Sequence, residues 1–168
     1  MNNIWIFGDS FVSPANKNYE DNFYPEWTWT KVLANKLDLD IKMVALPGIS
    51  NQWLSYEIIR FYDQIEQGDT VVIVTTEPNR NWLLYDKPSL SQLHMLNAEK
   101  LIGKKKYKVI QNYYDEFSEQ HELVNKLYYE WFLQWCRSKL SNRVKLCLLP
   151  GFNNTHFHDT TDNSIALK

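Results

Sequence analysis

The chain has 168 residues, a formal net charge of −2 at pH 7 and an apolar share of 44%. A chain of this length most simply forms a single domain over residues 1–168, and near-neutral charge with only one short lysine run disfavours a nucleic-acid partner. No apolar run approaches the roughly 20 residues of a membrane span, so we expect no membrane partner. Two cysteines outside any metal-type spacing, with no signal-peptide pattern, are typical of a cytoplasmic protein with reduced thiols.

Apolar runs alternate with helical patterns along the chain. The predicted strands cover residues 4–7, 41–46, 70–74 and 143–149, and the predicted helices cover residues 26–37, 51–68 and 118–140. Strands separated by helices pair in parallel through right-handed crossovers. We therefore expect an α/β fold with a doubly wound, mainly parallel sheet of about four to five strands.

Finer features follow from local residue types. Either Ser50 or Asn51 can cap the helix that follows them. In the last predicted helix, apolar residues recur every four positions, which predicts its apolar side: Leu123, Leu127, Trp131 and Trp135. Residues 81–117 are interpreted as an insertion with a short helix over 89–101 and a turn over 103–106. Residues 152–168 are an irregular tail.

The carboxyl ends of the strands are where an active site is expected in such a sheet. Ser10 follows the first strand directly, in the triplet Gly8-Asp9-Ser10. Gly8 permits a tight turn, and the unpaired peptide N–H groups after it can face a developing oxyanion. Gly48 ends the loop after the second strand, where it is either a turn glycine or a second oxyanion donor. Ser10 is accordingly a candidate nucleophile, although Gly-Asp-Ser is also a common turn.

The segments Ile6-Phe7-Gly8-Asp9-Ser10-Phe11 and Leu46-Pro47-Gly48-Ile49-Ser50-Asn51 resemble the SGNH (GDSL) hydrolase family, as does the order of elements over residues 1–80. The resemblance implies a flavodoxin-like, three-layer α/β/α fold. It also implies hydrolysis of acyl or acetyl esters of small molecules or carbohydrates, without a cofactor. Ser10 would be the nucleophile, and the N–H groups of Ser10 and Gly48 would form part of the oxyanion hole. Asp9 and Asn51, which lie within these motifs, are expected to contact the substrate.

The third family signature departs from the pattern. The family has Gly-x-Asn-Asp after the third strand, whereas this chain has Thr75-Thr76-Glu77-Pro78-Asn79-Arg80. Asn79 either donates to the oxyanion or simply forms a turn with Pro78. Arg80 either binds an anionic group of the substrate or is a surface charge.

The fourth signature, Asp-x-x-His, does not occur in this sequence. A serine hydroxyl is a poor nucleophile without a base. In one interpretation His156 or His158 folds back onto Ser10, assisted by Asp159 or Asp162. In the other, the chain stops before the family's usual base and final helix, either as a truncated form or as a binding or assembly protein that lacks the base. A partner such as a second copy would then cover the C-terminal side of the sheet.

The other histidines and the metal alternative are less informative. His94 and His121 fall in helical stretches and are predicted to be surface residues. The alternation of His156 and His158 is suited to a metal pair, but the metallo-hydrolase pattern His-x-His-x-Asp-His is not met. We therefore expect no metal.

Overall fold

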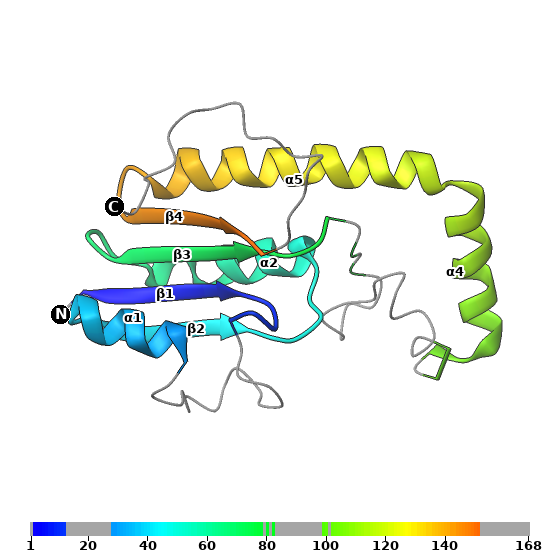
Figure 1. Cartoon of the computed structure of the whole chain (residues 1–168). Helices are drawn as coiled ribbons and strands as arrows, with labels where there is room; N and C mark the ends of the chain where they lie inside the picture. Colours follow the sequence, from blue (N-terminus) through cyan, green and yellow to red (C-terminus); the bar gives the residue numbers. More distant parts are fainter. Residues whose placement is uncertain are drawn as a thin grey trace.

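The computed structural model describes residues 2–12, 28–78, 80, 82, 99–100 and 102–151. Within them four parallel strands form one sheet in the order β2-β1-β3-β4 (Figure 1). The strands are β1 (Asn3–Gly8), β2 (Asp40–Ala45), β3 (Thr70–Thr75) and β4 (Lys145–Pro150). The α/β class and the parallel pairing predicted from the sequence are confirmed, with strand bounds shifted by one or two residues.

The helices are α1 (Trp29–Leu37), α2 (Asn51–Phe61), the 3-10 turn η2 (Tyr62–Gln64), α4 (Lys104–Glu116) and α5 (Ser118–Leu140). Three expectations need correction. The first helix begins at Trp29, because Thr28 is still extended. The second ends at Phe61 and continues only as the 3-10 turn, not as far as position 68. The expected turn over 103–106 is instead the start of α4.

The strand order places a topological switch point at the centre of the sheet. The chain passes from β1 to β2 on one side of β1, then crosses back to β3 on the other side. Phe7 of β1 is therefore in register with both Val44 of β2 and Ile73 of β3. Ligands of open α/β sheets bind in the crevice beyond the strand ends at such a point.

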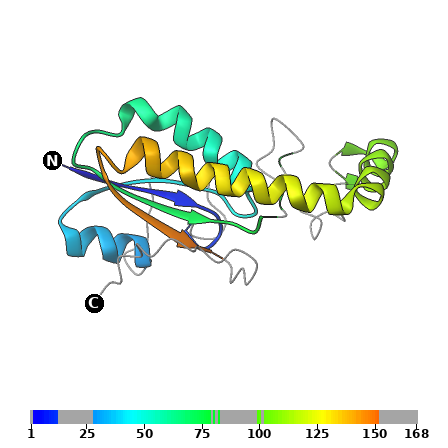
Figure 2. The ribbon, with the colours of Figure 1, turned by 90° about the horizontal axis from the view of Figure 1, so that it is seen from above.

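Apolar residues cover both faces of the sheet, which explains why β1 is continuously apolar. Trp5 and Phe7 face the cluster that α2 and α5 complete. Ile4 and Ile6 face the opposite cluster, to which α1 contributes Ala34. Figure 2 shows α1 on one side of the strands and both α2 and α5 on the other.

The buried side of α5 differs from the prediction. Its buried residues follow helical spacing on one side, at Asn125, Tyr129, Phe132, Cys136 and Leu140. By contrast, Leu123, Leu127 and Trp131 are 57%, 56% and 51% exposed. The N-terminal half of α5 extends beyond the ends of the strands and carries α4 (Figures 1 and 2). Trp135, the fourth residue of the predicted apolar side, is partly buried and packs against the core. The four-residue spacing therefore runs along the outward side of the helix at its first three positions.

At the end of the sheet where β1 and β3 begin, the carboxylate of Asp69 joins the two strands. Its carboxylate accepts hydrogen bonds from the peptide N–H of Asn3 (2.7 Å), the peptide N–H of Glu66 (3.0 Å) and the Trp5 indole (3.0 Å). Burial favours the neutral acid, but these donors outweigh it and hold the pKa of Asp69 below its ordinary value. The starts of β1 and β3 are thereby joined through one carboxylate.

Two smaller expectations concern the thiols and the membrane. Cys136 is buried and Cys147 partly buried, and both are free. Across the described ranges, the helices are too short or too polar to cross a bilayer.

Candidate functional site

The turn after β1 is held by Asp9 and presents Ser10 at its tip. The peptide N–H of Phe11 donates to Oδ1 of Asp9 (3.0 Å), and the N–H of Val12 donates to the Asp9 carbonyl (3.0 Å). Ser10 is exposed while Asp9 is fully buried. A Cβ on Gly8 would lie 2.4 Å from Cγ2 of Val12, so the close approach of Val12 requires glycine here.

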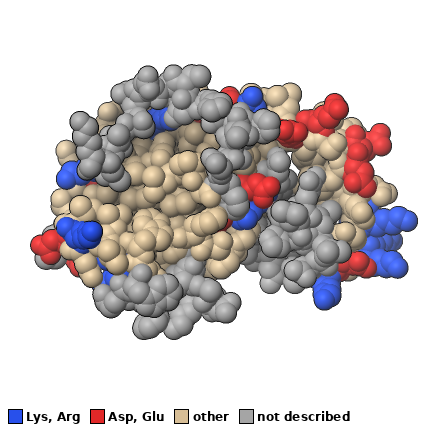
Figure 3. Space-filling model, viewed as in Figure 1, with Lys and Arg blue, Asp and Glu red and all other residues tan. Residues whose placement is uncertain are grey.

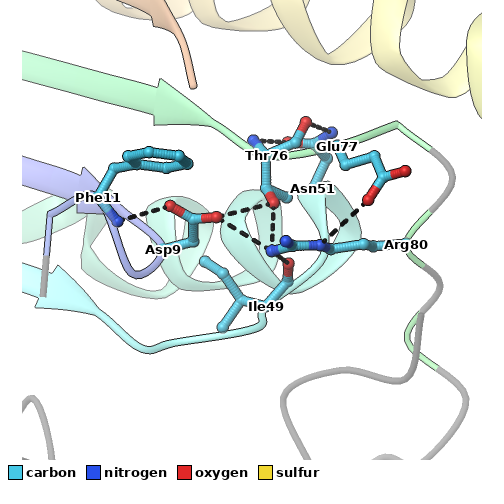
Figure 4. Close-up of polar contacts among 7 residues, drawn as sticks. All are labelled: Asp9, Phe11, Ile49, Asn51, Thr76, Glu77 and Arg80. Carbon is cyan, nitrogen blue, oxygen red and sulfur yellow. Dashed lines mark hydrogen bonds and ion pairs between the residues drawn. The ribbon is translucent and has the colours of Figure 1, made fainter. Parts of the chain in front are cut away.

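Asp9 is paired with an arginine from the loop after β3. Its Oδ2 accepts from the Arg80 guanidinium (3.0 Å) and from the Thr76 hydroxyl (3.1 Å), as Figure 4 shows. The same arginine nitrogen donates to Oγ1 of Thr76 (2.7 Å) and to the Ile49 carbonyl (3.4 Å). The Arg80 side chain is only 10% exposed, and its Nε lies 3.7 Å from Glu77. Arg80 is thus a partner of a buried carboxylate, and its interpretation as a surface charge is wrong.

Asn51 joins the start of α2 to the end of β3. Its Oδ1 accepts from the peptide N–H of Thr76 (2.9 Å), and its Nδ2 donates to the Thr76 carbonyl (2.9 Å). Asn51 is 3% exposed, so these two bonds satisfy main-chain groups that water does not reach. The helix cap is Ser50, whose hydroxyl accepts from the peptide N–H of Trp53 (3.2 Å).

Gly48 lies in the loop between β2 and α2, beside the turn after β1. Its φ is +77°, a left-handed conformation that favours glycine. The loop is held to the end of β1 because the N–H of Leu46 donates to the Gly8 carbonyl (3.3 Å). The two glycine-containing loops therefore leave neighbouring strand ends.

An aromatic pair joins the chain after β3 to α2. The ring of Trp82 is 5.3 Å from that of Tyr56 on α2, and the peptide N–H of Trp82 donates to Oε1 of Gln52 (2.7 Å). The chain after β3 is therefore tied to the first turns of α2. The sequence indicates neither ring as part of a site. Trp82 falls in the segment after Arg80, which is interpreted from the sequence as an insertion.

Several predicted site residues lie outside the described residues: Asn79, His156, His158, Asp159 and Asp162. His94, predicted to be a surface residue, lies outside them as well. His121 is described and is not at the strand ends. Its ring lies 4.9 Å from Tyr113 and 4.5 Å from Tyr114, between α4 and α5. In the part of the chain that the structure describes, no group of three His, Cys, Asp or Glu residues is placed to hold a metal ion.

Thr76 and the pairing of Asp9 with Arg80 were missed by the sequence analysis. The available signal was that Asp9 and Thr76 each follow a buried strand directly. What the sequence lacked was the strand order that makes β1 and β3 neighbours. Comparison of the chain with protein-family models, with curated proteins and with solved structures finds no match.

Proposed function

We propose that the protein is an SGNH-like, three-layer α/β/α serine hydrolase that cleaves acyl or acetyl esters, with Ser10 as the nucleophile. One observation carries the proposal: Ser10 is exposed on the turn that leaves central strand β1, at the switch point between β1 and β3. A nucleophile must be accessible to a substrate while its backbone is held still. The bonds of Asp9 to Phe11, Thr76 and Arg80 supply that rigidity.

The oxyanion would be bound by the peptide N–H groups of Ser10 and Gly48, with the Asn79 amide as a third donor. Backbone donors on fixed loops need no reorganisation when charge develops on the substrate oxygen. The Leu46–Gly8 hydrogen bond and the left-handed Gly48 support this role, because they fix one loop beside the other. The side chains of Asp9, Asn51 and Arg80 are each engaged within the fold, so they would hold the site in place, and their contact with the substrate stays a prediction.

The base would come from the tail, as His156 or His158, with Asp159 orienting the imidazole. The base removes the proton of the Ser10 hydroxyl while Oγ attacks the ester carbonyl carbon, and the alcohol leaves with that proton. Water then attacks the acyl-enzyme, releasing the acid and restoring the serine. Suitable substrates are esters of small molecules or carbohydrates, in the cytoplasm.

A fluorophosphonate probe tests the nucleophile. We expect intact-mass analysis to show one adduct on the wild type, none on Ser10→Ala, and an undiminished adduct on Ser118→Ala, a control at the exposed start of α5. Turnover of p-nitrophenyl acetate should follow the same pattern and should fall in His156→Ala or His158→Ala. Labelling that persists in Ser10→Ala would overturn the assignment.

A second candidate is a binding or assembly protein that retains this fold without turnover. One observation favours it. Among the described residues the histidine is His121, and its ring packs against Tyr113 and Tyr114, away from the strand ends. The same experiment separates the candidates. A folded wild type that takes no label and hydrolyses no ester supports the second.

A further inference from the structure

The outward side of α5 carries an apolar stripe, defined here as Leu123, Val124, Leu127 and Trp131. These side chains are 57%, 58%, 56% and 51% exposed. At 3.6 residues per turn they fall within about 100° of the helix circumference, opposite the side that buries Phe132 and Cys136. An exposed apolar surface of this kind marks an interaction site.

Charged residues form a flank along one edge of the stripe. Glu119, Lys126, Glu130 and Arg137 fall within about 40° of one another, next to Leu123. Their signs alternate along the helix as minus, plus, minus, plus. Read from the other end, the order is plus, minus, plus, minus. The flank is therefore complementary to a second copy of itself lying antiparallel.

The pairing can be written residue by residue. Positions 119 and 137 are equidistant from position 128, and so are 126 and 130. An antiparallel second α5 centred there places Glu119 opposite the second copy's Arg137 and Lys126 opposite its Glu130. Leu127 then lies near the two-fold axis, and Val124 faces the second copy's Trp131. The charged residues and the apolar residues are therefore centred on the same position of α5 to within about one residue.

From this geometry we propose that the protein forms a two-fold symmetric homodimer through antiparallel pairing of its α5 helices. A two-fold interface must be self-complementary, and this surface is. In parallel two-fold pairing the two flanks would lie at opposite edges of the interface, so these four charges would not face one another. The wider charge distribution agrees: acidic residues gather where α4 meets α5 (Figure 3), at Asp115, Glu116, Glu119 and Glu122, whereas Arg137 and Lys139 lie at the other end of α5.

Exchange of charges tests this directly. Lys126→Glu with Arg137→Glu makes the flank wholly acidic, and Glu119→Lys with Glu130→Lys makes it wholly basic. Each double variant alone should dissociate at least about tenfold more readily than the wild type, since every facing pair becomes repulsive. Their equimolar mixture should form a heterodimer, because every facing pair is then attractive. Sedimentation velocity and native mass spectrometry measure both.

The apolar stripe has its own test. Leu127→Glu places charges near the axis and should leave a monomer, whereas Val109→Glu on α4, which is 66% exposed, is the matched control and should leave the dimer intact. Circular dichroism verifies that each variant is folded. The proposal is overturned by a wild type that is monomeric at all concentrations, by double variants that remain dimers, or by a mixture that does not form the heterodimer.

Discussion

Oδ2 of Asp9 lies 3.0 Å from the guanidinium of Arg80, so the turn after β1 is tied to the loop after β3 by a buried ion pair. The carboxylate is fully buried, and the arginine side chain is almost so. Thr76 completes the group because its hydroxyl donates to the carboxylate and accepts from the guanidinium. The position of the candidate nucleophile therefore depends on side chains more than sixty positions away in the sequence.

Removing one partner of this ion pair should destabilise the protein strongly. Arg80→Met leaves a buried, uncompensated carboxylate, for which we expect a loss of about 3–5 kcal/mol in the free energy of unfolding. Urea denaturation monitored by tryptophan fluorescence measures the loss. Adding Asp9→Asn should restore part of it, because the charge left behind is then neutral. A double variant no more stable than Arg80→Met would show that the charge is not the cause.

Both hydrogen bonds between Asn51 and Thr76 should contribute to the stability of the fold. Asn51→Ala leaves a buried N–H and a buried carbonyl without partners, at about 1–3 kcal/mol each. Asn51→Asp keeps the acceptor for the Thr76 N–H but loses the donor to the Thr76 carbonyl. Thermal unfolding should place both variants below the wild type, because Asn51→Asp also buries a carboxylate beside the Thr76 carbonyl. Equal stability of the wild type and Asn51→Ala would exclude the role.

The fold was more predictable than the site, for physical reasons. A strand such as Thr70–Thr75 can be predicted because it is a run of β-branched residues. The contact between Asp9 and Arg80 depends on the order of the strands, which no local pattern records. The α5 helix shows a further limit: four-residue steps drift by about 40° each around a helix. A spacing of four therefore matched the exposed Leu123 and Leu127 as well as it would have matched a buried side.

Glu57 should make stability depend on pH in an unusual direction. Burial raises the pKa of this carboxyl, and Arg60, 3.2 Å away, only partly opposes it. A carboxyl with a raised pKa in the folded state loses stability as pH rises through and above its ordinary value of 4.5. Glu57→Gln should therefore be more stable than the wild type at pH 7.5, with a smaller gain at pH 4. Urea titrations at the two pH values measure this, and an equal effect at both would contradict it.

Asp69 should make stability depend on pH in the opposite direction, so that stability falls as the pH is lowered. Because its pKa is lowered in the folded state, its contribution is present above the ordinary value of 3.8 and is lost as pH falls below it. Asp69→Asn leaves at least one of the two main-chain donors or the Trp5 indole poorly paired and should lose about 1–3 kcal/mol at pH 7. The difference from the wild type should shrink below pH 4. Denaturant midpoints across pH 2–7 provide the measurement, and a constant difference would rule out the carboxylate.

The strand order also determines when the sheet can be completed during synthesis on the ribosome. The neighbours of β1 are β2 and β3, so three strands and Arg80 are available once about half the chain has emerged. Among the described residues, the outer edge of β3 pairs with β4, which is made from residues 145–150. Until then β3 presents unpaired main-chain groups, the kind of edge to which other nascent chains add. We expect truncated chains that end before β4 to aggregate through this edge.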